Sequence, residues 1–480
     1  MVRFSIVLTT TDRPELLPAA VRAVLEMEFQ DFELLVSDNF SRIPAAKILA
    51  DVQDKRLRII RTDRRLPVTD HWEFVWEYIR GEYVMYLGDD NALHPTILTF
   101  ADRAIRDYDL DILSWRVCLY FHPDWDIEYE ALPNQGNILG FDPGTTHQLY
   151  ECRSEAVLKK FCSDIRASGC FPCMLNFLFR KSAADMIRKR TGRLFWAPNP
   201  DISSSYLMLG VIRPGRYAFF DGFGGIGGRS RNSNLASLLS RGKASTKARE
   251  YVTEFRGQDL LPLHEPKFVA MANSLAATIS QAKTLMPDYF KRFDFDRTKL
   301  ARETIDDIYV HRNQPWIDDL DFLAEVDRFI DSLPAADAIE VFRYRDERLA
   351  EVQKSNNAGP GGKNYVRNYE EARVSLLDFW QKADSKDKAF AWRLFRETGR
   401  NPLGRYWNFG VTTYVDMALF GGRDIADAAR KLPHILAAFD RDRGQFADYY
   451  EQIGILGKVL GAEPQECSSA TVAESMVEAL

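Results

Sequence analysis

Short apolar runs alternate with amphipathic stretches through residues 1–119. The runs have the length of buried strands and lie at Phe4–Leu8, Phe32–Val36, Leu57–Ile60, Tyr83–Leu87 and Ile112–Leu119. Between them, apolar residues recur at helical spacing, as they do from Leu16 to Leu25 and from Trp72 to Ile79. Strands that alternate with helices on short loops predict an α/β fold with a doubly wound, mostly parallel sheet.

Polar side chains stand where these strands end. Thr10, Asp38, Arg61 and Asp89 each follow a different apolar run. The carboxyl ends of parallel strands meet at one edge of a sheet, and open α/β sheets bind their ligands there. The pattern therefore predicts a binding site at this edge.

The strand at Tyr83–Leu87 leads into Gly88, Asp89, Asp90 and Asn91. Adjacent carboxylates repel each other unless a cation or a proton lies between them. A hard divalent cation that bridges to a phosphate would separate them. The alternative is an acidic turn in which one of these residues caps the next helix, and the local sequence leaves both interpretations open.

Two later segments also carry candidate chemistry. Asp201 follows a proline and precedes the helical stretch Ile202–Leu209, so it fits either a helix N-cap or a functional carboxylate. The glycine-rich stretch Gly222–Asn234 contains Arg229 and Arg231. It suits a mobile loop that closes over an anionic ligand, with a flexible linker between domains as the alternative.

Helical spacing dominates from about residue 245 onward. The expected helices are Phe268–Leu285, Phe322–Leu333, Ala338–Val352, Glu370–Lys382, Lys386–Glu397, Ile425–Phe439 and Phe446–Val459. We therefore expect an α/β domain over residues 1–240, a mainly helical domain over 241–460 and a flexible tail over 461–480. The sequence does not indicate what the helical domain does.

The composition excludes several classes of protein for this chain. The chain of 480 residues is 46% hydrophobic, which is typical of globular proteins, and its net charge of −6 argues against a nucleic-acid binder. Six cysteines are too few for a disulfide framework, and the lone pair Cys170 and Cys173 lacks the further ligands of a zinc site. We find no signal-peptide pattern and no apolar run long enough to span a membrane, so we expect a cytoplasmic location.

Three segments in order resemble glycosyltransferase family 2, whose members are inverting enzymes with the GT-A fold. They are the strand and loop Ile6–Leu17, the strand and turn Phe32–Asn39, and the segment Gly81–Asn91 with Pro95 after it. The resemblance covers residues 1–110 and continues more weakly to about 235. It implies transfer of a sugar from a nucleotide donor to a hydroxyl group.

The resemblance also implies roles for single residues. Thr10, Thr11 and Arg13 fall where the family's first loop lines the nucleotide, and Asp38 falls where an aspartate binds the N3–H of uracil. Gly88 stands in place of the first aspartate of the common Asp-x-Asp motif, so the resemblance assigns Asp89 to the ribose and Asp90 to Mn²⁺ or Mg²⁺.

Asp201 falls where the family's catalytic base lies, a match by order and distance along the chain. From the composition of the glycine-rich loop, we expect Arg229 and Arg231 to contact the donor. His71 replaces an asparagine found in similar members, which leaves its role open.

The first expected partner is a nucleotide-sugar donor, and Asp38 favours a UDP-sugar. The second is an acceptor, a glycan or a lipid-linked sugar, in surface polysaccharide or glycoconjugate synthesis. We expect no nucleic-acid partner, a possible peripheral contact with the inner face of the membrane, and possible homo-oligomers formed through the helical region. The alternatives are a sugar-phosphate nucleotidyltransferase, which would need a glycine-rich loop after the first strand, and a non-catalytic binding protein with a degenerate site.

Overall fold

A computed structural model of the chain describes residues 2–125, 136–141, 144–167, 169–173, 176–196, 199–231, 271–309, 320–357, 413–439 and 445–462. The expected helices at Glu370–Lys382 and Lys386–Glu397 lie outside these residues, as does all of the expected tail except residues 461 and 462. Within the described part of the chain, no helix is both long and apolar enough to cross a membrane.

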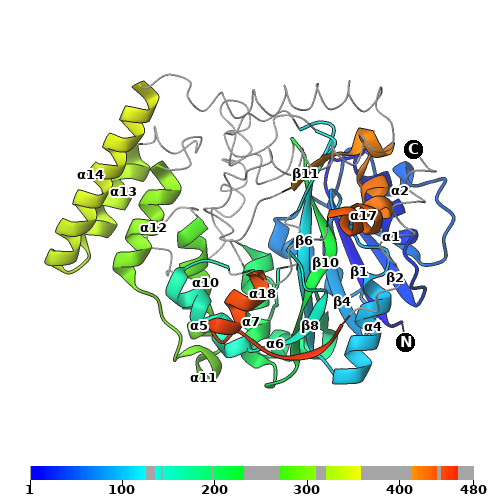
Figure 1. The fold of residues 1–480 in the computed structure, drawn as a ribbon, viewed down its shortest axis with the longest axis horizontal. Helices are drawn as coiled ribbons and strands as arrows, with labels where there is room; N and C mark the ends of the chain where they lie inside the picture. The colour runs from blue at the N-terminus through cyan, green and yellow to red at the C-terminus, as the bar shows by residue number, and fades with distance from the viewer. Residues whose placement is uncertain are drawn as a thin grey trace.

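A twelve-stranded sheet forms the centre of the molecule (Figure 1). Its strands are β1 (Phe4–Thr10), β2 (Phe32–Asp38), β3 (Leu57–Arg61), β4 (Tyr83–Gly88), β5 (Ala92–Leu93), β6 (Ile112–Phe121), β7 (Ile138–Phe141), β8 (Gln148–Cys152), β9 (Phe177–Arg180), β10 (Tyr217–Arg229), β11 (Thr413–Asp416) and β12 (Leu456–Ala462). The main order is β12-β8-β10-β6-β9-β4-β1-β2-β3.

The N-terminal strands pair in parallel, in the order β3-β2-β1-β4. The short strand β9 is antiparallel to both β4 and β6, and it joins this part of the sheet to the parallel pair β6 and β10. The predicted α/β fold class with parallel N-terminal strands is confirmed. Parallel pairing aligns the carboxyl end of β1 with that of β4, where Thr9 lies opposite Gly88.

Helices cover both faces of the sheet because successive strand residues point to opposite sides. Ile6 and Leu8 of β1 pack toward α1 (Leu17–Leu25) and α4 (Ile97–Tyr108), while Val7 packs in a second core on the other face. The second core includes α3 (Val68–Trp76), α5 (Ser154–Asp164), α6 (Lys181–Thr191) and α7 (Pro200–Val211). The remaining short helix, α2, spans Ala45–Ile48.

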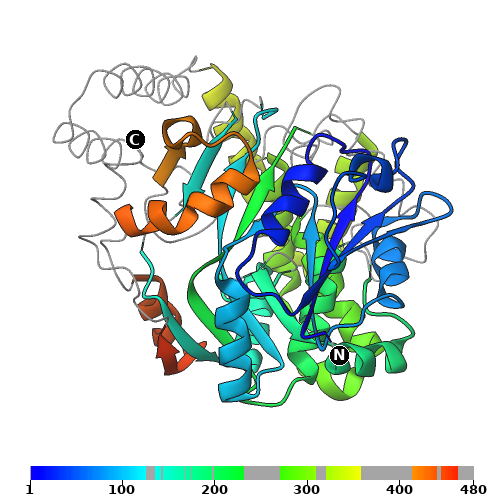
Figure 2. The same cartoon turned by 90° about the vertical axis from the view of Figure 1, so that its right-hand side faces the viewer.

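The helical region begins on the same side as α7 and extends away from the sheet (Figures 1 and 2). It contains α10 (Met271–Leu285), α11 (Pro287–Phe290), α12 (Arg297–Tyr309), α13 (Leu320–Asp331) and α14 (Ala335–Asn357). Phe290 of α11 stacks on Tyr206 of α7 with ring centroids 5.3 Å apart. The first helical elements therefore share a core with the sheet domain.

The described C-terminal residues return to the sheet. They form β11, the short 3-10 helix η3 (Met417–Phe420), α17 (Ile425–Phe439), α18 (Gln445–Gln452) and β12. β11 pairs with β7, and β12 pairs with β8. The expected helix Phe446–Val459 is wrong in its second half, because the chain from Leu456 is a strand that pairs with β8. The proposed boundary at residue 240 stays a prediction, but part of the region beyond it completes this sheet.

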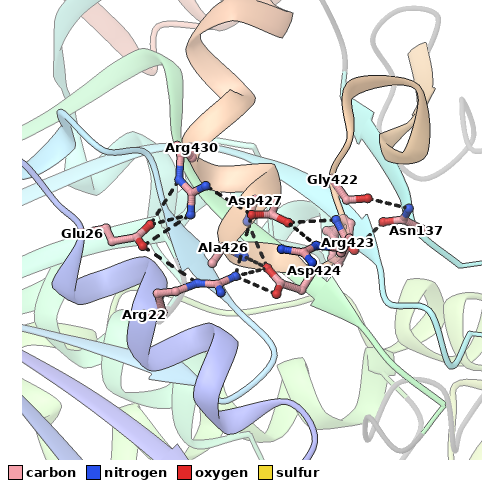
Figure 3. Close-up of polar contacts among 10 residues, drawn as sticks. Arg22, Glu26, Asn137, Gly422, Arg423, Asp424, Ala426, Asp427 and Arg430 are labelled. Atoms are coloured by element: carbon pink, nitrogen blue, oxygen red, sulfur yellow. Dashed lines mark hydrogen bonds and ion pairs between the residues drawn. The ribbon is translucent and has the colours of Figure 1, made fainter. Parts of the chain in front are cut away.

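Polar contacts hold α17 to α1 (Figure 3). Arg22 of α1 donates to Asp424, and Arg430 of α17 donates to Glu26 at 3.0 Å. Nearby, the Asn137 amide donates to the carbonyl of Gly422 at 3.1 Å. Apolar residues of α17 bury against Ala23 of α1 and Ile226 of β10. The segment Thr413–Phe439, which we call the C-terminal clasp, thus joins α1 to the sheet.

The expectation of a mobile loop at Gly222–Asn234 is wrong for residues 222–229, which are the second half of β10. Residues 222–228 are buried, and β10 pairs with β6 as far as the half-buried Arg229. Glycine is required there by space, because a Cβ on Gly228 would lie 1.7 Å from the carbonyl oxygen of Asp90. Residues 232–234 lie outside the described residues.

Candidate functional site

The turn after β4 places Asp89 and Asp90 at the carboxyl edge of the sheet. Both are buried, with Asp89 2% and Asp90 7% exposed. Thr10, at the end of the neighbouring strand β1, donates its hydroxyl to Asp89 Oδ2 at 2.6 Å. Two strands that pair in parallel therefore bring together two of the predicted residues, as the sequence pattern indicated.

Arg13 lies between the two carboxylates. Its Nη1 donates to Asp89 Oδ1 and to Asp90 Oδ2, each at 2.9 Å. Burial opposes the charge on Arg13, but attraction to the two carboxylates outweighs it and raises the pKa of the guanidinium. The cation that the adjacent aspartates need is thus supplied by the loop between β1 and α1.

The surroundings of Asp89 oppose its ionisation. Burial raises the pKa of its carboxyl, the charge of Arg13 lowers it, and the neighbouring Asp90 raises it again. The net pKa lies above the ordinary value, which fits a group whose solvation is replaced by a few fixed partners.

The backbone and second oxygen of Asp90 are also fixed. Asn91 Nδ2 donates to Asp90 Oδ1 at 2.9 Å, and Asn91 Oδ1 accepts from the backbone N–H of Gly228 at 2.9 Å. His122 Nε2 lies 2.9 Å from the Asp90 carbonyl, so this nitrogen carries the hydrogen. β6 and β10 therefore hold the turn from one side.

His122 was not among the predicted residues. It follows β6 directly, and Asp124 comes two residues later and accepts from the backbone N–H of Arg231 at 3.3 Å. The signal that would have found them was present, because His122 and Asp124 are polar residues at the end of a strand, like Thr10 and Asp89.

Arg229 ends β10 on the side of Asp90. Burial lowers the pKa of its guanidinium, and the charge of Asp90 partly offsets this. Its side chain donates to the Gly228 carbonyl at 3.3 Å. No ion pair joins Arg229 to a carboxylate among the described residues. Arg231 lies in the turn that follows, and Thr11 lies half-buried in the turn after β1.

Asp38 ends β2 and is 1% exposed. Its Oδ1 accepts from the backbone N–H of Ser41 at 2.8 Å, and its Oδ2 accepts from the backbone N–H of Ala45 at 3.0 Å and from Arg61. Burial raises the pKa of this carboxyl, but these hydrogen bonds outweigh burial and lower it. Asp38 shapes the β2–α2 loop, and a contact with uracil stays a prediction.

His71 lies in α3 beneath this loop and is buried. Its Nε2 is 2.8 Å from the Ser37 hydroxyl. Burial lowers the pKa of the imidazole to about 4, with Asp38 raising it and Arg65 lowering it further. The ring is therefore neutral at physiological pH, and its visible contact is to a strand of the sheet.

Asp201 lies in the first turn of α7, where Asn199 is the N-cap residue, so the N-cap interpretation is wrong. The thiol of Cys173 donates to Asp201 Oδ2 at 3.5 Å. Burial raises the pKa of Asp201, while hydrogen bonds from backbone N–H groups and from Cys173 lower it by less. Among the described residues, no hydrogen bond or ion pair joins Asp201 to Asp89 or Asp90.

The carboxylates suit Mg²⁺ or Mn²⁺ by type, since both ions prefer hard oxygen ligands. Their surroundings favour such an ion less. Each of the four carboxylate oxygens of Asp89 and Asp90 already accepts a hydrogen bond from Thr10, Arg13 or Asn91, and the positive charge of Arg13 between them would repel a metal ion. In the described part of the chain, no group of three or more His, Cys, Asp and Glu side chains could hold a metal ion.

The family model described as Glycosyl transferase family 2 matches residues 5–161, which include Thr10, Arg13, Asp89 and Asp90. No curated protein sequence matches the chain.

Two solved structures illustrate the structural comparison. S. aureus TarS 1–349 in complex with UDP-GlcNAc is 13% identical over 74% of this chain and 92% of that chain, with a TM-score of 0.39. The mannosyltransferase PcManGT from Pyrobaculum calidifontis in complex with GDP-Man and Mn²⁺ is 11% identical over 73% of this chain and 87% of that chain, with a TM-score of 0.31. Likeness at this level does not indicate what this chain binds.

Proposed function

Because this chain belongs to glycosyltransferase family 2 and is a glycosyltransferase with a GT-A fold, we propose that it moves a sugar from a nucleoside-diphosphate donor to an acceptor hydroxyl group with inversion at the anomeric carbon. A UDP-sugar is the proposed donor. The proposed acceptor is a glycan or a lipid-linked sugar in surface polysaccharide or glycoconjugate synthesis. The family match favours this enzyme over a non-catalytic binding protein.

One observation supports the position of the donor. Thr10 and Arg13 follow β1, Asp89 and Asp90 follow β4, and all four meet at the carboxyl edge of the parallel strands. Ligands of open α/β sheets bind at this edge. The same edge carries Arg229, a cation that suits an anionic ligand.

Inverting transfer is a single displacement. The acceptor oxygen forms a bond to the anomeric carbon, the bond from that carbon to the diphosphate breaks, and the acceptor proton passes to a base. We assign the base to Asp201, because burial raises the pKa of its carboxyl toward the range in which a carboxylate accepts a proton well. The buried edge of the site would keep water away from the reacting sugar.

Other parts of the proposal rest on the sequence alone. Thr11 would line the nucleotide with Thr10, Asp89 would meet the ribose, and Arg231 would contact the donor from the turn after β10. Binding of Mn²⁺ or Mg²⁺ by Asp90 stays a prediction, and no step of the proposed transfer depends on it. A cytoplasmic location, contact with the membrane and homo-oligomers also stay predictions.

A screen of sugar-nucleotide donors tests the proposal. The full chain is incubated with UDP- and GDP-sugars, with and without simple sugar acceptors, and nucleotide release is measured. We expect release from one donor, and proton NMR of the glycosylated product should show the inverted anomeric configuration. A product that retains the donor's configuration would contradict inversion. If no donor is bound or cleaved, the proposed function is wrong.

A further inference from the structure

Arg13 already contacts both carboxylates that would hold a divalent cation. Each oxygen of Asp90 accepts a hydrogen bond, from Arg13 or from Asn91, and each oxygen of Asp89 accepts one from Arg13 or from Thr10. Each oxygen therefore keeps only one further lone pair for a metal ion. The guanidinium already neutralises one carboxylate charge, so a divalent ion at these oxygens would be repelled by a cation of the chain itself.

Arg13 is held firmly in this position. Its side chain is 18% exposed, and the carboxylates that it contacts are 3% and 10% exposed. Hydrogen bonds between charged groups in such a site are stronger than those at a surface. The loop that carries Arg13 leads into α1, which the C-terminal clasp ties to the sheet.

Arg229 supplies a second positive charge. It approaches Asp90 from the end of β10, and its backbone carbonyl accepts from the N–H of His122 at 2.8 Å. Arg229 is half-buried and forms no ion pair with a carboxylate among the described residues, so a bound anion would reduce the desolvation cost of its guanidinium. Arg13 pairs with both Asp89 and Asp90, and Arg229 adds a positive charge beyond that pairing.

We propose that Arg13 and Arg229, rather than a divalent metal ion at Asp90, provide the positive charge that binds the donor's diphosphate. The inference rests on the proposed function, since it concerns the same donor. As the bond to the anomeric carbon breaks, the diphosphate takes the bonding electron pair and gains one negative charge. Fixed cations near the diphosphate stabilise that charge, as a metal ion does in metal-dependent enzymes.

Nucleotide binding to the wild-type chain decides between the two sources of charge. Calorimetric titrations use UDP, GDP, ADP, CDP and dTDP, each with EDTA and with Mn²⁺. We expect at least one nucleotide to bind in EDTA with an affinity within about threefold of that in Mn²⁺. Binding that disappears in EDTA and returns with Mn²⁺ would overturn this inference and leave the proposed function intact. If no nucleotide binds under either condition, both are wrong.

Variants test the two arginines. Arg13→Met and Arg229→Met should each weaken nucleotide binding in EDTA by about 10- to 100-fold, the usual effect of losing a charged hydrogen bond. Arg106→Met is the matched control, because Arg106 is 67% exposed and lies near the end of α4, at the opposite edge of the sheet. Unchanged binding in both site variants would overturn the inference.

Mn²⁺ alone gives a second readout. Electron paramagnetic resonance should show no Mn²⁺ bound to the wild-type chain, and Arg13→Met should acquire a site because it frees oxygens of both aspartates. Mn²⁺ binding by the wild-type chain that Asp90→Asn abolishes would contradict the inference. If Arg13→Met does not fold, Arg13→Lys, which keeps the charge, should retain metal-independent binding.

Discussion

Arg22 and Asp424 are 402 positions apart in the sequence, yet Arg22 Nη2 donates to both carboxylate oxygens of Asp424 at 2.7 Å. The contact joins α1, which follows the loop of Arg13, to the residue just before α17. Asp424 also accepts from the backbone N–H groups of Ala426 and Asp427, so it orders the start of α17 as well. The C-terminal clasp is therefore part of the structure that supports the site.

Breaking this contact should destabilise the fold by a small amount. The side chains are 40% and 32% exposed, so Asp424→Ala should lower the free energy of unfolding by about 1 kcal/mol.

Loss of apolar packing in α17 should cost more. Ile435→Ala, at a fully buried position of α17, should lower the free energy of unfolding by about 2–5 kcal/mol. Denaturant titration measures both. Arg423→Ala is the control, since Arg423 is 86% exposed. If Ile435→Ala were as stable as the wild type, the packing of α17 on the sheet would be in doubt.

Asp201→Asn should remove the proposed base and keep the shape of the side chain. We expect the turnover number to fall by about 10²–10⁴, the usual effect of losing a positioned base, with donor affinity unchanged. Transfer assays and nucleotide titrations measure the two quantities. Asp185→Asn is a suitable control, because Asp185 lies on α6 and pairs with Lys181. Near-normal turnover in Asp201→Asn would require a different base.

His71 should make the stability of the fold depend on pH. Its folded pKa of about 4 lies below the ordinary value of 6.5, so between these values the unfolded chain binds more protons. The contribution of His71 is therefore complete above pH 6.5 and is lost as pH falls toward 4, by up to roughly 3 kcal/mol. Denaturant titrations across this range measure the slope. His71→Gln should make it shallower, and an unchanged slope would show that other groups cause it.

Gly228→Ala should disturb the site through the backbone. The added Cβ would lie 1.7 Å from the carbonyl oxygen of Asp90 and 2.7 Å from His122 Nε2, so the Asp90 turn must move. We expect a loss of stability of about 1–3 kcal/mol and weaker nucleotide binding. Gly457→Ala on β12 is the matched control, because its Cβ would make only ordinary contacts, the nearest at 3.5 Å. Equal behaviour of the two variants would contradict the role of Gly228.

The sequence predicted the first half of the sheet well and the second half less well. β1, β2 and β4 are buried on both faces, so each appears as a continuous apolar run, and the predicted starts of these strands are the observed ones. The sequence predicted a mobile loop from Gly222 onward, where β10 in fact continues to Arg229, because glycines carry no hydrophobic signal. Their small size matters only because Asp90 and Trp115 approach the strand from elsewhere in the chain.

In the candidate site, too, some features could be predicted from the sequence and others could not. The order of residues placed Thr10 and Asp89 at one edge, because parallel strands bring their carboxyl ends together whatever the details of packing. It also predicted that the two adjacent carboxylates would repel each other unless a cation or a proton lay between them, but it could not say what that would be.

By itself, therefore, the sequence determined the α/β class, the edge of the sheet where Thr10, Asp89 and Asp90 meet, and most of the polar residues gathered at this candidate site, since these follow from strand periodicity and local order. Only the tertiary structure decided that Arg13 lies between Asp89 and Asp90, that Asp38 is used by its own loop, and that the clasp from residue 413 returns to α1. Each of these depends on distances between segments far apart in the chain, which no local pattern contains.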